Sequence, residues 1–370
     1  MKHNYLYFPS IVCTASLLLA GFAAVSAPEW PQKPITVYVG WTAGGSSDVT
    51  TRALVLEMEK KLGSKVLVTN IPGANGSIGA TQVAKAPPDG YFWFGGAAVH
   101  GTWPVLGYSD VSWTDFYAFL DLVMPTTIYV LKNAPWNTLQ ELIADIKASP
   151  KGRFRYGHPG AGSNGEIFGG LLLETAGAAG KARSIPYNGG REAGRYLLSK
   201  EIDFASVTMG DLADWAAAGR IRPLVNLFLR ETVFEGVRYP PITDVYPELA
   251  PYQAINPCYG VYVRRDTPAE IVTKIAEAFV YAIQQEAFLD IVIRERAGIL
   301  MPRLGRASDE QMARIESARG WALFRLGVAP NDPSEFDVPE LHEWSWPPHQ
   351  RAAALRPWPE AVETIYDRLP

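Results

Sequence analysis

Cysteine is almost absent from this chain, with two residues in 370, and only Cys258 lies outside the N-terminal segment. A single remaining thiol can form neither an intrachain disulfide nor a cysteine-rich metal site. Basic charge is also scarce, because the formal net charge is −4 and lysine and arginine form no continuous stripe. These absences argue against nucleic acid as a partner, and we expect neither a bound metal nor a cofactor.

Long hydrophobic runs are lacking after the N-terminal segment, so no later span is expected to cross a membrane. Within that segment, Lys2 precedes an apolar run over residues 11–25, and Val25-Ser26-Ala27 has the small residues typical of a signal peptidase site. We predict a signal peptide over residues 1–27, cleaved near Ala27, and a mature protein in the periplasm. A retained N-terminal anchor is the alternative.

Glycine and proline are plentiful, with 33 and 29 residues in a chain of 370. This length and composition favour two α/β lobes with many short connections over a helical bundle. In the first part of the chain, strand-like and helix-like segments alternate in the order expected for a parallel sheet with right-handed crossovers. The expected strands are 35–39, 66–70 and 91–95, and the expected helices are 48–62 and 78–84.

The alternation restarts after residue 125 and predicts a second sheet. Its expected strands are 126–131, 154–156, 183–187, 202–207 and 222–228, and its expected helices are 138–148, 167–176, 192–198 and 212–218. A strand at 259–263 then returns the chain to the first lobe, and helices are expected at 268–286 and 308–326. We therefore predict lobe 1 from residues 28–128 with 258–330, lobe 2 from residues 129–257, and a Pro/Trp-rich extension over 331–370 that packs across a lobe surface.

Two glycine-rich loops each follow an expected strand and precede an expected helix. They read WTAGGSSD at residues 41–48 and HPGAGSNGE at residues 158–166. Glycine permits a sharp turn and a close approach of backbone to ligand, and a helix N-terminus offers free N–H groups with a partial positive charge. The two loops together predict a carboxylate that is held by backbone amides between two lobes as a hinge closes.

Other chemistries fit the second loop less well. Gly160-x-Gly162-x-x-Gly165 matches a dinucleotide-binding fingerprint, but the next strand ends in Tyr187-Asn188 rather than in the required acidic residue. Ser163 follows Gly-Ala-Gly instead of lying in Gly-x-Ser-x-Gly, which disfavours nucleophilic catalysis.

Two histidines, His100 and His158, fall at expected strand ends that face the cleft. Either could hydrogen-bond a ligand or satisfy nearby backbone, and no third residue at a suitable spacing completes a metal site. We expect a binding protein and not an enzyme. An exported hydrolase acting on an organic acid and a ligand sensor derived from a binding protein are the alternatives.

The sequence resembles the substrate-binding proteins of tripartite tricarboxylate transporters, also called the Bug family. The resemblance covers roughly residues 29–330 and is carried by stretches in a characteristic order: Trp30–Ile35, Ala43–Asp48, Pro72–Ala80, Ala84–Tyr91, Gly160–Ser163, Ile185–Gly190 and Ala218–Leu224. It implies a type II periplasmic-binding-protein fold with a hinge and an interlobe cleft. It also implies a monomer that closes on a small organic acid and hands it to membrane permease subunits.

Several positions depart from the pattern of that family. Glu166 stands where the family usually has histidine, Asn188 where lysine is common, and Asn75 where glycine is common, and the tail beyond about residue 330 has no counterpart. A carboxylate near an anion site repels the ligand, so Glu166 predicts a less anionic ligand or one that carries an amine, unless Glu166 points outward or pairs with Arg191.

The loops, the expected strand ends and the resemblance together define one set of candidate ligand-binding residues. They are Trp41, Ala43, Gly44, Gly45, Ser46, Asp48, Asn75, Ala98, His100, His158, Gly162, Ser163, Asn164, Glu166, Tyr187, Asn188, Gly189 and Thr208.

Overall fold

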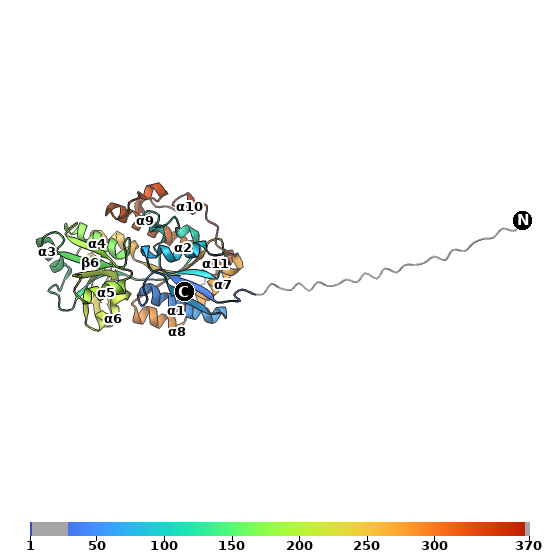
Figure 1. Cartoon of the computed structure of the whole chain (residues 1–370), viewed down its shortest axis with the longest axis horizontal. Helices are drawn as coiled ribbons and strands as arrows, with labels where there is room; N and C mark the ends of the chain where they lie inside the picture. The colour runs from blue at the N-terminus through green and yellow to red at the C-terminus, as the bar shows by residue number, and fades with distance from the viewer. Residues whose placement is uncertain (2–28, 367–370) are drawn as a thin grey trace.

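The computed structural model describes Met1 and residues 29–366, so the predicted signal peptide and its cleavage site lie outside the described residues. Figure 1 shows two groups of elements side by side, one around α1 and α2 and the other around α3 to α6. In the part of the chain that the structure describes, no helix combines the length and the apolar character that a membrane crossing requires.

The first group is built on a six-stranded mixed sheet with the order β13-β4-β12-β3-β1-β2. At the β2 edge of this sheet β1 pairs in parallel with β2 and β3, whereas β12 pairs antiparallel with β3 and β4, and β13 pairs antiparallel with β4. The strands are β1 (Ile35–Val39), β2 (Val66–Asn70), β3 (Phe92–Ala97), β4 (Phe116–Val123), β12 (Cys258–Arg264) and β13 (Ile299–Arg303). The helices that accompany them are α1 (Ser46–Leu62), α2 (Ser77–Lys85), α7 (Ala269–Ala282) and α8 (Glu286–Leu289).

The second group is built on a five-stranded mixed sheet with the order β7-β6-β8-β5-β9. The strands are β5 (Thr126–Leu131), β6 (Phe154–His158), β7 (Ala182–Pro186), β8 (Phe204–Thr208) and β9 (Ile221–Asn226), and a small hairpin of β10 (Thr232–Phe234) and β11 (Val237–Tyr239) follows. The helices are α3 (Leu139–Ala148), α4 (Asn164–Thr175), α5 (Gly190–Leu198) and α6 (Met209–Ala217). Two buried apolar clusters pack with this sheet.

The chain passes between the sheets twice, between β4 and β5 and again between β9 and β12. Asn256 joins the two passages, because its Oδ1 accepts a hydrogen bond from Thr126 N at 2.8 Å and its Nδ2 donates to Leu227 O at 2.7 Å. Both side-chain groups of this buried amide are therefore satisfied by backbone of the crossing segments. These contacts connect the two crossing segments to each other at the junction of the lobes.

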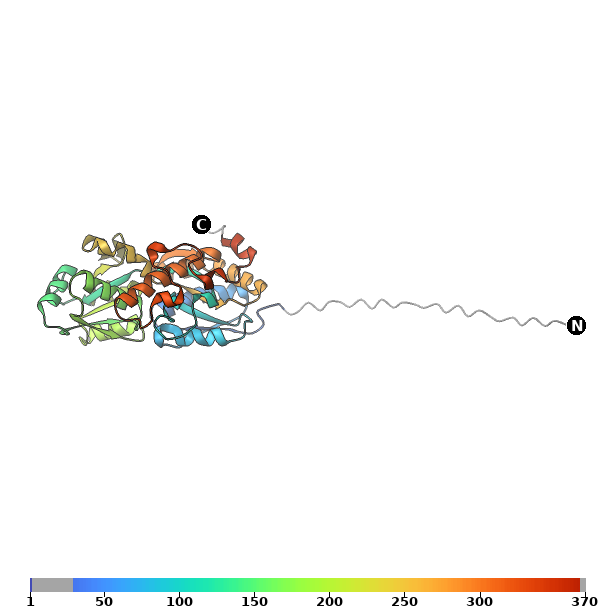
Figure 2. The same cartoon turned by 90° about the horizontal axis from the view of Figure 1, so that it is seen from above.

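Helix α9 (Gly305–Arg325) contributes to both cores and therefore does not belong to one lobe alone. Its first half packs into the apolar cluster of the first sheet through Met312, Ala313 and Ile315. Its second half packs into a cluster of the second sheet through Ala318, Ala322 and Leu323. Figure 2 shows this helix and the residues after it, in orange and red, lying over the molecule.

The C-terminal residues that follow α9 pack mainly on the first lobe. Trp358 is buried, with its ring centroid 4.7 Å from that of Tyr117 and 5.3 Å from that of Phe119. Its Nε1 donates to Asp309 Oδ2 at 3.0 Å, and the same carboxylate pairs with Arg265 at 2.7 Å. Two short helices, α10 (Gln350–Ala353) and α11 (Glu360–Tyr366), lie in this segment.

Most expected elements are present with shifted ends, but one central strand was missed. Strand β4 is buried along nearly its whole length, so its sequence FYAFLDLV shows no alternation of apolar and polar residues. The parallel arrangement predicted for the first three strands is confirmed, and the returning strand β12 enters the same sheet antiparallel between β3 and β4.

Candidate functional site

A cavity lies between the two sheets, where loops from both lobes meet. Its fifteen lining residues are Trp41, Thr42, Gly45, Ser46, Ser47, Asn75, Ala97, Val99, Pro159, Asn164, Gly189, Gly190, Thr208, Asp211 and Tyr259. The cavity measures about 20 Å³, which is the room that about one water molecule needs. A second cavity of about 330 Å³ shares Trp41, Asn75 and Pro159 with it. A small organic acid therefore requires some separation of the lobes to reach the inner cavity.

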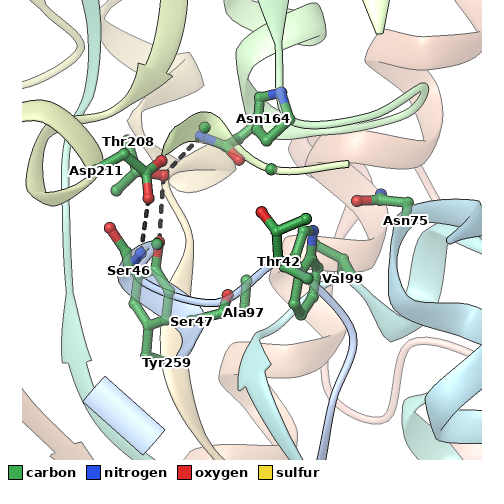
Figure 3. A pocket seen from close by; sticks show the side chains of 15 residues that line it. Thr42, Ser46, Ser47, Asn75, Ala97, Val99, Asn164, Thr208, Asp211 and Tyr259 are labelled. Atoms are coloured by element: carbon green, nitrogen blue, oxygen red, sulfur yellow. Dashed lines mark hydrogen bonds between the residues drawn. The ribbon is translucent and has the colours of Figure 1, made fainter. Parts of the chain in front are cut away.

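Several hydrogen bonds cross from one lobe to the other at the inner cavity (Figure 3). Ser46 N donates to Asp211 Oδ1 at 2.7 Å, and the Tyr259 hydroxyl donates to Thr208 Oγ1 at 3.2 Å. Close by, Thr42 N donates to the carbonyl oxygen of Asn188 at 3.3 Å. These contacts hold the lobes together in a closed arrangement.

The carboxylate of Asp211 binds at the N-terminus of α1, where the sequence analysis predicted the carboxylate of a ligand. Asp211 lies in the first turn of α6, directly after β8, and its carboxylate reaches across to the first residue of α1. The side chain is almost fully buried, and burial raises the pKa of its carboxyl group above the ordinary value. The N-terminus of α1 thus binds a carboxylate in this structure, and the carboxylate belongs to the opposite lobe.

The glycine-rich loops are held in shape by acidic side chains that lie four residues further along. Gly44 N donates to Asp48 Oδ2 at 2.9 Å, and Gly162 N donates to Glu166 Oε2 at 2.7 Å. In the loop after β7, Asn188 N donates to a carboxylate oxygen of Glu192 at 2.9 Å. The predicted role of the Gly44 and Gly162 amides as ligand donors is therefore not what the structure shows, because acceptors within the loops already engage both.

Glu166 takes no part in lining the two interlobe cavities. Besides the Gly162 amide, its carboxylate accepts a hydrogen bond from Ser184 Oγ at 2.9 Å, and its side chain borders a separate cavity that α4 and Arg325 help to line. Of the alternatives in the sequence analysis, the structure agrees with a side chain that points away from the interlobe cavities, and this side chain is buried. The alternative pairing with Arg191 does not occur, because Arg191 pairs with Asp214.

The two candidate histidines lie in packed surroundings, away from the cavities. His100 is fully buried among Phe94, Trp103 and Tyr262, and burial lowers its pKa to about 3. His158 is also buried, with Nδ1 2.9 Å from Gly160 O and Nε2 2.7 Å from Ser184 Oγ. Burial lowers the pKa of His158 as well. Both are therefore structural residues within the lobes.

The structure brings together part of the predicted set. Trp41, Gly45, Ser46, Asn75, Asn164, Gly189 and Thr208 line the inner cavity, and Tyr187 and Asn188 line the second one. The others do not line either cavity: Ala43, Gly44, Asp48, Ala98, His100, His158, Gly162, Ser163 and Glu166. Ser163 instead caps α4, because its side chain accepts a hydrogen bond from Glu166 N. Within residues 29–366, no group of three or more potential metal ligands is present.

Sequence reasoning missed Asp211 and Thr42 as cavity residues. For Asp211 a signal was available, because it lies three residues after Thr208 at the carboxyl end of a strand, where ligands of α/β proteins bind. Tyr259 belongs to the first sheet, and it reaches Thr208 of the second through the packing of the lobes.

Two α/β lobes, joined by two chain crossings and meeting at a cavity lined from both sides, define a solute-binding protein of the periplasmic type. Residues 50–302 match the sequence model described as "Tripartite tricarboxylate transporter family receptor". The chain belongs to this family of transporter receptors, and it is therefore a binding protein and not an enzyme.

A relative agrees with this assignment, and two solved structures share the fold. A UPF0065 protein of Agrobacterium vitis, from the TAR-I ttuE-ttuC' intergenic region, is 30% identical over 289 residues, which cover 76% of this chain and 80% of the relative. The structure of the periplasmic binding protein BugD has a TM-score of 0.73 at 24% identity and covers 81% of this chain and 99% of its own. MatC from Rhodopseudomonas palustris with bound malate has a TM-score of 0.67 at 22% identity, covering 81% and 99%.

Proposed function

We propose that this protein captures a small organic carboxylate between its lobes in the periplasm and delivers it to the membrane subunits of a tripartite tricarboxylate-type permease. The single observation that carries the proposal is the contact between Ser46 N and the carboxylate of Asp211. A ligand carboxylate can replace that of Asp211 at the same amide as the lobes rearrange. Bound malate in the structural neighbour MatC is consistent with this ligand class.

Closure of the lobes supplies the binding mechanism. Each lobe contributes backbone and side-chain groups to the cavity, so a bound acid contacts both and stabilises the closed arrangement. We propose that Trp41, Ser46, Asn75, Asn164 and Thr208 form the wall around the acid. The lobes are lobe 1 (28–128 with 258–330, α9 being shared) and lobe 2 (129–257).

Export is part of the proposal. Residues 1–27 have the pattern of a signal peptide, and cleavage near Ala27 releases the chain as a monomer into the periplasm. Residues 331–366 form an additional packed segment, mainly on lobe 1, and we assign them no contact with the ligand.

The Ser46 amide can be removed with little disturbance of the backbone. Ser46 is the first residue of α1, where proline is favoured, and Gly45 before it has an extended backbone with φ −79° and ψ 173°, which proline tolerates in the preceding residue. Ser46→Pro therefore deletes one N–H group. Ser46→Ala is the matched control, because it removes the hydroxyl and keeps the amide.

Calorimetry on the mature chain with mono-, di- and tricarboxylates tests the function. We expect saturable binding of at least one acid, which is recovered unchanged. Ser46→Ala should bind that acid normally, whereas Ser46→Pro should lose roughly ten- to a hundredfold in affinity, because a hydrogen bond to a charged group contributes about 1.5–3 kcal/mol. Absence of binding across the panel, or equal binding by the two variants, refutes the proposal.

A further inference from the structure

The second glycine-rich loop is held from two sides by side chains that line neither interlobe cavity. His158 Nδ1, at the end of β6, lies 2.9 Å from the carbonyl oxygen of Gly160. Glu166 Oε2, in α4, accepts a hydrogen bond from Gly162 N at 2.7 Å. Ser184 of β7 joins the two side chains, because its Oγ lies 2.7 Å from His158 Nε2 and 2.9 Å from Glu166 Oε1.

These contacts require more hydrogen atoms than the three side chains carry in their ordinary states. A carbonyl oxygen only accepts, so His158 Nδ1 must carry a hydrogen toward Gly160. One hydrogen is then needed between His158 Nε2 and Ser184 Oγ, and another between Ser184 Oγ and Glu166 Oε1. A serine hydroxyl has a single hydrogen and donates to one neighbour at a time. A neutral imidazole with an ionised carboxylate therefore leaves one contact without a hydrogen, and one additional proton completes the set.

The additional proton has two possible positions within the cluster. With the proton on the imidazole, both ring nitrogens donate and Ser184 donates to Glu166. With the proton on the carboxyl group, Glu166 donates to Ser184 and Ser184 donates to His158 Nε2. Burial lowers the pKa of the His158 imidazole, whereas the nearby Glu166 carboxylate and the Gly160 carbonyl act to raise it. Both arrangements contain the same number of protons, so the count holds for either one.

The surroundings of the cluster combine burial with access to solvent. His158 is fully buried and Glu166 is 9% exposed, while Ser184 and Glu166 border a side cavity of about 300 Å³. Arg325, which also borders this cavity, lies 3.6 Å from Glu340, so among the described residues the basic group beside Glu166 is His158, at 3.7 Å. The titratable or charged groups that face Glu166 are Tyr156 and His158 of β6, Glu174 of α4, Arg325 of α9 and Tyr108 of the first lobe.

We propose that His158, Ser184 and Glu166 form a proton-binding site that makes the conformation of the second glycine-rich loop depend on pH. With the proton bound, the loop is held at both Gly160 and Gly162. Without it, two lone pairs face each other across one of the short contacts, so His158 or Glu166 must move and the loop loses one of its two attachments. Gly160 borders the second interlobe cavity, so the site controls part of that cavity's wall. The proton site does not depend on the identity of the ligand.

Glu166→Gln tests the proton count, because its amide supplies the missing hydrogen without titrating. The amide Nε2 can donate to Ser184 while Oε1 accepts from Gly162 N. Above about pH 5 an unfolded glutamate is ionised, so the native wild type holds one proton that the variant does not need. The stability of wild type relative to the variant is therefore lost as pH rises.

Urea unfolding of both chains between pH 5 and pH 9 measures this difference. We expect the unfolding equilibrium constant of wild type, relative to that of Glu166→Gln, to increase by at least about tenfold over this range, which is the effect of one proton over one pH unit. Glu174→Gln makes the same change at an exposed position of α4 that borders the same side cavity, and its stability relative to wild type should be constant. A constant ratio for Glu166→Gln overturns the proposal.

Nitrogen NMR of the wild-type protein at pH 7 tests the same site without a substitution. We expect a hydrogen on His158 Nδ1, either in an imidazolium or in a neutral ring. A neutral ring with its hydrogen on Nε2 overturns the proposal, because the hydrogens then suffice without an additional proton. The amide resonance of Gly162 should move with pH in wild type and stay constant in Glu166→Gln. A constant Gly162 resonance in wild type refutes the control of the loop.

Discussion

Asp121 provides a sharp test of the energetics of the first lobe. It lies in β4 at an irregularity of the sheet, where Leu120 pairs with Gly260 and Leu122 pairs with Tyr259. The side chain is fully buried, Oδ1 accepts a hydrogen bond from Leu122 N, and Oδ2 has no partner. Burial raises the pKa of this carboxyl group from 3.8 to about 7.

The sign of the resulting pH dependence follows from the two pKa values. The native protein binds the Asp121 proton more tightly than the unfolded chain, so the contribution to stability is intact below pH 4 and is lost as pH rises to about 7. Each pKa unit corresponds to about 1.4 kcal/mol. Between pH 5 and pH 8 the free energy of unfolding should therefore fall by about 3 kcal/mol on account of this group.

Asp121→Asn removes the titration while it keeps the shape of the side chain. The uncharged amide has its own burial cost, but that cost is independent of pH and cancels when two pH values are compared. We expect urea unfolding to show that the stability of the variant relative to wild type increases by about 3 kcal/mol from pH 5 to pH 8. Asp110→Asn, at an exposed position, should show no such change. A relative stability that is constant with pH, or that decreases, refutes the reasoning.

Two further substitutions test the cavity wall and the C-terminal segment. Gly190→Ala would place a Cβ atom in collision with the carboxylate of Asp211 in the same lobe, so that this carboxylate must move from its place beside Ser46. We expect at least about tenfold weaker ligand binding in calorimetry, and unaltered affinity would contradict the placement of Asp211 at the binding site. Trp358→Ala removes a buried indole and its hydrogen bond to Asp309. In denaturant titrations the free energy of unfolding should fall by about 3–5 kcal/mol. A loss below about 1 kcal/mol would show that the C-terminal segment contributes little to the stability of lobe 1.

Local sequence patterns predicted a large part of the fold. Strand β1 alternates buried and partly buried residues, and the helix that follows ends at Gly63, whose φ of 67° is left-handed as its position predicts. Thr138 caps α3 by accepting a hydrogen bond from Glu141 N. These features depend on neighbours within one or two turns of chain, so the sequence contains the information directly.

Strands buried on both faces were harder to predict. In β4 the apolar residues are interrupted only by Asp121 and do not alternate with polar ones, and no glycine or proline turn marks where the strand begins. The placement of α9 across both lobes was equally hidden, because its two halves are distinguished only by the cores that they meet. Such features depend on long-range packing, for which a single sequence carries weak signals.

The sequence by itself determined that the chain is an α/β protein with two glycine-rich loops at strand ends, and its resemblance indicated the receptor family. Tertiary structure decided which backbone amides of those loops remain available to bind a ligand. Asp48 and Glu166 bind loop amides within their own lobes, and Asp211 crosses the cleft to the N-terminus of α1. The physical reason is that hydrogen-bond capacity is shared in three dimensions: a carboxylate distant in sequence can satisfy an amide that local pattern leaves free.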